Sequence, residues 1–120
     1  MRWFRRRTTP PLPRAPREAV KILAAHLHVH TAESLVVLTT SPAALREARK
    51  ALEAGAAARL ACPDSRDVTL MPGEGNPSLD PDEGWLIPLP AESREFLSAL
   101  TTDQPGAWEV PGTNVGVVAE

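Results

Sequence analysis

The sequence predicts a small α+β domain in which two or three helices pack on one face of a mixed or antiparallel sheet. An apolar run over residues 34–40 leads directly into an amphipathic helix, and residues 84–100 repeat that order. Further short apolar segments are separated by proline and glycine. In a chain of 120 residues, this alternation is typical of one domain with a single core.

Composition limits both the core and the partners of this domain. Aromatic residues make up only 4% of the chain, so the core must be built mainly from Leu, Val and Ala. The net charge is −2, with basic residues concentrated at the start and acidic residues after position 64. An acidic body does not favour phosphate backbones, so the domain as a whole is not expected to bind nucleic acid. Arginine outnumbers lysine and alanine is abundant, which suggests a GC-rich bacterial genome.

Residues 1–15 are predicted to form a basic, proline-rich, flexible arm before a single domain over residues 16–120. Proline fixes φ and removes amide donors, which favours an extended arm. The first seven residues of the arm offer an anionic partner four arginines: Arg2, Arg5, Arg6 and Arg7. Two interpretations stay open, weak association with nucleic acid or lipid through these arginines, and a solvated tail.

Residues 16–30 are predicted to form an additional N-terminal helix. Pro16 suits the first turn of a helix, and Val20, Leu23 and Leu27 recur at helical spacing. The end of this segment, HLHVH, also alternates with period two, as a strand does. Whether residues 26–30 are helix or strand is therefore left open.

The segment Ser34–Gly55 predicts a strand followed by a capped helix. The continuous apolar run Leu35–Leu38 indicates a central strand that is buried on both faces. Ser41 can cap the helix and Pro42 suits its first position. Gly55 stands where a left-handed residue ends a helix.

The rest of the chain predicts short strands, a second helix and one long loop. The strands cover residues 57–62, 67–71, 84–89, 107–110 and 115–119, and the helix covers residues 90–100. Pro88 indicates an edge position or a strand end, and residues 72–83 are expected to form an acidic loop. The closest simple arrangement is a ferredoxin-like β-α-β-β-α-β core with the extra N-terminal helix.

The candidate metal ligands are His26, His28 and His30. On a strand, alternate side chains share one face, so three imidazoles would form a facial site for a divalent transition metal such as Zn²⁺, Mn²⁺ or Fe²⁺. On a helix, positions 26 and 30 share a face and position 28 does not. That alternative gives no three-ligand site from this segment.

The phrase HLHVHT resembles the opening motif of the PHP family of metal-dependent phosphoesterases, and SPAALREARKALEAG resembles the helix that follows it. The resemblance covers about residues 26–60 and implies that His28 and His30 are metal ligands. His26 stands where the family has an acidic residue, and no histidine follows His30, so the family's activity is not inferred.

The segments TTSPAALREA, RDVTL and NPSL are similar to bacterial SseB-like domains, which are α+β modules without known catalytic residues.

Two other groups could carry chemistry. Cys62 is the single cysteine, so an internal disulfide is excluded, and we interpret it as a core residue rather than a nucleophile. Asp80, Asp82 and Glu83 resemble a calcium loop in composition but lack its glycine and glutamate positions. A solvated turn is the favoured interpretation.

The function that these observations favour is that of a non-catalytic binding or regulatory protein, with a protein partner or homodimerisation through a sheet edge or helix face. No cofactor is predicted. The alternatives are a metal-binding protein or metal-dependent hydrolase that uses HLHVH, and nucleic-acid association through the arm. No apolar run reaches the roughly 18 residues of a membrane span, and no signal-like segment opens the chain, so a cytoplasmic protein is expected.

Overall fold

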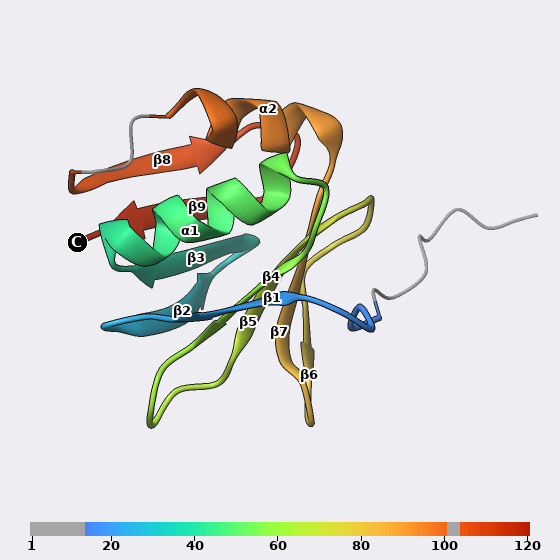
Figure 1. Cartoon of the computed structure of the whole chain (residues 1–120), viewed down its shortest axis with the longest axis vertical. Coiled ribbons are helices and arrows are strands. Elements are labelled where there is room, and N and C mark those ends of the chain that lie inside the picture. Colours follow the sequence, from blue (N-terminus) through green and yellow to red (C-terminus); the bar gives the residue numbers. More distant parts are fainter. Residues whose placement is uncertain (1–13, 101–103) are drawn as a thin grey trace, which may run out of the picture.

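The computed structural model describes residues 14–100 and 104–120, which form two mixed sheets and two helices (Figure 1). The α+β class is confirmed. The helices are α1 (Pro42–Glu53) and α2 (Ala91–Ala99). The strands are β1 (Val20–Leu23), β2 (Leu27–Ala32), β3 (Leu35–Thr40), β4 (Ala58–Ala61), β5 (Val68–Pro72), β6 (Ser78–Asp80), β7 (Gly84–Leu89), β8 (Gly106–Val110) and β9 (Val115–Ala119).

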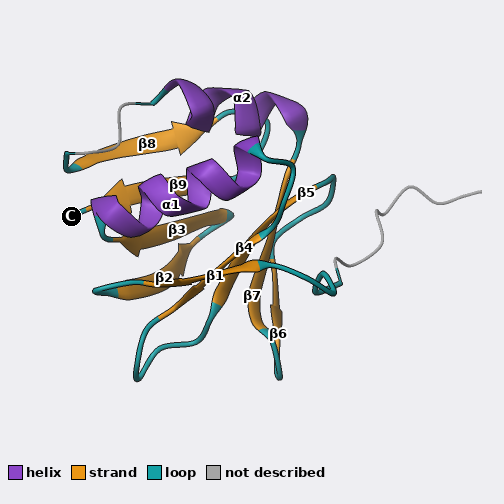
Figure 2. Ribbon diagram, in the orientation of Figure 1, coloured by secondary structure: helices purple, strands orange, loops and turns teal. Residues whose placement is uncertain are grey.

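The strands form a five-stranded sheet, in the order β1-β4-β5-β7-β6, and a four-stranded sheet, in the order β2-β3-β9-β8. Both helices lie on the same side of the four-stranded sheet, and α1 lies in front of β3 and β9 (Figure 2). One core cluster joins α1 to both sheets, for example through Leu45, Leu38 and Leu60. The ferredoxin-like core is not confirmed, because the described residues form two sheets where that fold has one.

The predicted N-terminal helix is replaced by β1 and β2. The amide N of Val20 donates to Ala57 O, and the amide N of Ala24 donates to Ala61 O, both at 2.8 Å. Ile22 is buried against the core through this pairing. The partner strand lies more than thirty residues later in the chain, so the tertiary pairing overrides the local helical spacing.

The start and end of α1 agree with the sequence prediction. Ser41 Oγ accepts a hydrogen bond from the amide N of Ala44 at 3.3 Å, and Pro42 is the first helical residue. Gly55 follows the helix with φ +83°, a conformation that glycine adopts without a steric cost. These local signals therefore decide where α1 begins and ends.

Strand β3 is central in its sheet, as predicted, but only one of its faces is covered. Val36 and Leu38 are 7% and 0% exposed, whereas Leu35 is 37% exposed and Val37 is half-buried. The prediction of burial on both faces is therefore wrong for the face that carries Leu35 and Val37. The apolar run places apolar side chains on both faces of β3, but the described part of the chain packs against only one of those faces.

The region after β5 also departs from the prediction in one place. Residues 78–80 form β6, so the predicted acidic loop over residues 72–83 is interrupted by a short edge strand. Pro88 lies in β7 beyond Leu86, the last residue of β7 that pairs with β6. Proline has no amide N–H to donate, and at position 88 that side of β7 has no partner strand. The prediction that Pro88 marks an edge position or a strand end agrees with this register.

Candidate functional site

Strand β2 brings two of the three candidate ligands together. The rings of His28 and His30 lie on one face, with centroids 5.5 Å apart and planes tilted by 33°. Both residues are exposed. His26 precedes the strand, and its carbonyl O accepts a hydrogen bond from the Thr40 hydroxyl at 3.0 Å.

The chemistry open to this pair is limited. Zinc sites in proteins use three or four side-chain ligands, and no group of three or more His, Cys, Asp and Glu residues within residues 14–100 and 104–120 is arranged to hold a metal. The described residues thus offer a divalent transition metal two imidazole nitrogens at an exposed edge strand. Metal binding by His28 and His30 stays a prediction.

The uncovered side of the four-stranded sheet, here called the outer face, is defined by strand register. Paired residues on neighbouring strands point to the same face, so the register places side chains in cross-strand rows. One row is His30, Val37, Gly116 and Glu109, and the next is His28, Thr39, Val118 and Ala107. Ala32 and Leu35 begin a third row at the edge.

Burial separates the outer face from the inner face that packs on the helices. On the inner face, Leu38, Val115, Val117 and Ala119 are at most 3% exposed. On the outer face, every side chain is exposed or half-buried, and the one buried position is Gly116, which has no side chain. The described chain therefore leaves the outer face open to solvent.

The composition of the outer face is unusual for a solvated sheet surface. Antiparallel and mixed sheets with one wet face normally alternate apolar inward and polar outward residues. Here Val37 and Val118 occupy the centre, and Glu109 is the only carboxylate in the two complete rows. The sequence signal for this surface is the uninterrupted apolar character of β3 and β9, which by itself favours burial on both faces.

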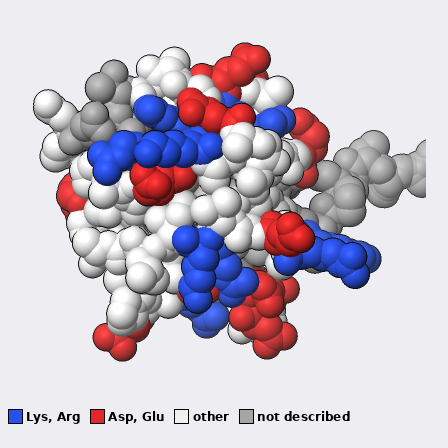
Figure 3. Space-filling view, viewed as in Figure 1, with Lys and Arg blue, Asp and Glu red and all other residues white. Residues whose placement is uncertain are grey.

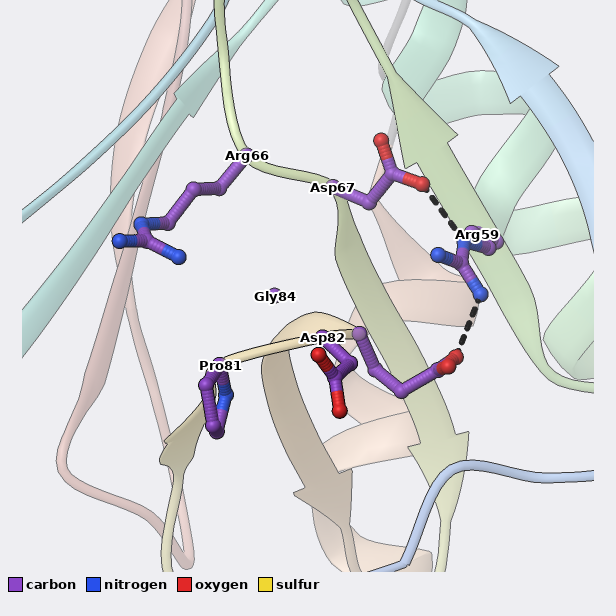
Figure 4. Close-up of a pocket in the computed structure, with 7 residues that line it drawn as sticks. Arg59, Arg66, Asp67, Pro81, Asp82 and Gly84 are labelled. Carbon is purple, nitrogen blue, oxygen red and sulfur yellow. Dashed lines mark hydrogen bonds and ion pairs between the residues drawn. The ribbon is translucent and has the colours of Figure 1, made fainter.

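A second polar site surrounds Arg59 on the five-stranded sheet, in a pocket of about 190 Å³ (Figure 4). Arg59 Nε donates to Asp67 Oδ2 at 2.7 Å, and Arg59 Nη1 donates to Glu83 Oε1 at 2.8 Å. The hydrogen bond to Asp67, followed by that to Glu83, raises the pKa of Arg59 above its ordinary value. Both acids are thus engaged by a cation of the same chain.

The acidic turn between β6 and β7 is held by its own backbone. Asp80 Oδ1 accepts hydrogen bonds from the amide N of Asp82 at 2.8 Å and of Glu83 at 2.9 Å. These bonds, that from Glu83 first, lower the pKa of Asp80. Gly84 closes the turn with φ +84°, and a Cβ there would lie 2.2 Å from Asp67 O. The Arg59 pocket is therefore a structural junction of β4, β5 and this turn.

The remaining candidates occupy less informative positions. Cys62 is half-buried after β4, packs against the main core, and its Sγ lies 3.8 Å from Ala25 O.

Arg2, Arg5, Arg6 and Arg7 lie outside the described residues, so anion binding by the arm stays a prediction. Loss of salt-dependent nucleic-acid binding on deletion of residues 1–15 would support it, and unchanged binding would contradict it. Neither α1 nor α2 in the described part is long and apolar enough to cross a membrane.

The described residues define an α+β domain of two mixed sheets, in which the outer face of the four-stranded sheet has no covering layer. No family model matches the chain, and no curated protein sequence matches it. Among solved structures, Drosophila Suppressor of Fused is similar with a TM-score of 0.49 and 13% sequence identity. The match covers 81% of this chain and 26% of that one, so the chain spans a minor part of that protein's length.

Proposed function

We propose that the chain is a non-catalytic protein-binding module and that the outer face of its four-stranded sheet is the binding surface. The observation that carries this proposal is the apolar centre of that face, where Val37 and Val118 are half-buried and no second layer of described residues lies over them, with Leu35 37% exposed at the edge. Apolar surface that a folded domain leaves without a covering layer marks an interaction site, because covering it removes apolar area from water.

Two other surfaces, the helical side and the Arg59 pocket, are charged. Basic and acidic side chains are intermixed on the helical side of the molecule (Figure 3), as expected of a solvated surface. The acids nearest Arg59 already bind that residue. The outer face combines an apolar centre with polar groups at its two edges, which is the anatomy of a protein interface.

The test is a pair of surface variants with the same added charge. Val37→Glu places a carboxylate at the centre of the outer face, and Ala43→Glu places one at an exposed position of α1 on the other side. Each protein is immobilised, its captured partners are identified by quantitative mass spectrometry, and the affinity of the main partner is measured by calorimetry. We expect Val37→Glu to weaken that affinity at least about 10-fold and Ala43→Glu to leave it unchanged. Equal affinities for the two folded variants would contradict the proposal.

A second candidate function is weak binding of a divalent transition metal, which the 5.5 Å separation of the His28 and His30 rings favours. Calorimetric titration of untagged protein with Zn²⁺ tests it against a His28→Ala/His30→Ala variant. Heat of binding that the variant loses would support the site. Absence of binding, or binding that the variant retains, would exclude it. A hydrolase would need further ligands beyond the two that β2 brings together.

A further inference from the structure

We propose that the partner of the outer face is the outer face of a second copy of this chain, in a two-fold symmetric dimer with the symmetry axis parallel to the strands. This inference rests on the proposed function and names its partner. In such a dimer, β2 of one copy lies over β8 of the other, and β3 lies over β9. Two sheets that pack face to face in this way form a sandwich with about 10 Å between them.

The row of His30 shows why this orientation is self-complementary. Its four members run from His30 on edge strand β2, through Val37 and Gly116, to Glu109 on edge strand β8. The two-fold axis places the same row of the second copy opposite in reverse order. His30 then faces Glu109 of the second copy, and an imidazole N–H donor meets a carboxylate acceptor at each end of the row.

The centre of the same row pairs a large residue with the smallest one. The reversal sets Val37 of one copy against Gly116 of the other, so a valine side chain enters the space that glycine leaves open. In the neighbouring row, His28 faces Ala107 and Val118 faces Thr39 of the second copy. Two of these contacts, Val37 with Gly116 and His28 with Ala107, therefore set a large group against a small one, whereas Val118 and Thr39 are of similar size.

Gly116 provides an independent observation, because the described monomer gives no reason for a glycine there. Its φ lies outside the left-handed region, and a Cβ built on it would meet only Trp108 O at 3.7 Å and Val37 Cγ2 at 3.8 Å. Both are ordinary van der Waals distances. Glycine within a strand weakens the strand and often marks the close approach of another backbone. The approach that we infer is that of the second copy.

The size of the face sets the expected strength of the dimer. Four strands about 4.8 Å apart and about five residues long cover roughly 19 Å by 17 Å, which is about 600 Å² over the two copies. This area is below that of stable protein interfaces and fits a weak, transient contact. Together with the pairing of polar edges, it predicts a weak, reversible dimer with a dissociation constant in the high micromolar range.

Sedimentation equilibrium of the full chain, in EDTA so that no metal bridges histidines, tests the dimer from micromolar to about millimolar concentration. We expect the wild type to dimerise and Gly116→Ala to weaken dimerisation about 10-fold or more, while the Gly116→Ala monomer stays folded. Ala43→Gly, on the exposed side of α1, is the matched control and leaves dimerisation unchanged.

A charge exchange gives a test that does not depend on packing at Gly116. In His30→Glu, the new carboxylate faces Glu109 of the second copy, and in Glu109→Arg, the new guanidinium faces His30 of the second copy. Each single variant loses the imidazole–carboxylate hydrogen bond and therefore weakens the dimer. The double variant restores it, because the introduced carboxylate of one copy then faces the introduced guanidinium of the other. Within one chain, the two positions lie on opposite edge strands, so only a contact between copies can produce the rescue.

The outcomes separate this inference from the proposed function. A wild type that remains monomeric to about millimolar concentration, or a dimer that Gly116→Ala and the charge exchange leave unaffected, overturns the inference. If the protein is monomeric and Val37→Glu still abolishes binding of a different protein, the proposed function stands without the dimer. If the protein binds its partners equally well with and without Val37→Glu, both proposals fail.

Discussion

His30 and Glu109 belong to the same cross-strand row of the four-stranded sheet but lie on its two opposite edge strands, β2 and β8. Three inter-strand spacings separate them, about 14 Å. Their effects on the monomer should therefore be independent. We expect His30→Glu and Glu109→Arg each to change the free energy of unfolding by less than about 0.5 kcal/mol and to add within the same margin. Urea denaturation at low micromolar protein concentration measures this, and a coupling well above that margin would show contact within one chain.

Two adjacent residues of β3 should respond very differently to truncation. Leu38 is 0% exposed in the core that α1 shares with both sheets, and Leu38→Ala should lower the free energy of unfolding by about 2–5 kcal/mol. Val37 is half-buried on the outer face, and Val37→Ala should cost less than about 1.5 kcal/mol in dilute solution. Equal losses in chemical denaturation would mean that a further layer covers the outer face of the monomer.

The Arg59 junction should contribute to stability through its partly buried ion pairs. Arg59→Met removes the donors to Asp67 and Glu83 and leaves two neighbouring carboxylates without their cation. We expect a loss of about 1–3 kcal/mol in the free energy of unfolding. Exposed Arg66 lines the same pocket and is the control, since Arg66→Met should change stability by less than about 0.5 kcal/mol. A loss at Arg66 as large as that at Arg59 would argue against this account.

Gly84 should tolerate no side chain, unlike Gly116. At position 84, φ is +84° and a Cβ would lie 2.2 Å from the backbone O of Asp67, which also accepts a hydrogen bond from the amide N of Trp85. Gly84→Ala should cost more than about 2 kcal/mol in thermal or urea unfolding, because the backbone must shift. Gly116→Ala should leave the monomer as stable as the wild type or more stable. A neutral effect at Gly84 would refute the close approach of the two backbones.

The acidic turn should make stability depend on pH in a defined direction. The backbone amides of Glu83 and Asp82 lower the pKa of Asp80 in the folded state. A lowered folded pKa means that the carboxylate contributes stability above the unfolded pKa of about 4, and that this contribution is lost as pH falls through the folded value. Asp80→Asn should therefore be less stable than the wild type at pH 6, and the difference should shrink as the pH falls below about 4. A difference that stays constant over this range in chemical denaturation would contradict the assignment.

The candidate site could be predicted only in part from the sequence. The period of two in HLHVH was sufficient to place His28 and His30 on one face if the segment is a strand, and the strand is what forms. The outer face could not be predicted in full, because its rows join β2, β3, β9 and β8. The register between β3 and β9 brings together residues about eighty positions apart.

Local sequence signals are enough to define most helices and strands of this protein. Ser41, Pro42 and Gly55 set the limits of α1, and short apolar runs bounded by proline and glycine set most strands, because caps, turns and side-chain periodicity act over a few residues. Long-range packing is what makes residues 16–30 form strands in place of a helix, divides the described strands into two sheets and covers β3 on one face. A strand obtains its hydrogen-bond partners and its covering layer from distant segments. The apolar pattern therefore shows which residues share a face, whereas the packing of the whole chain decides which face stays open.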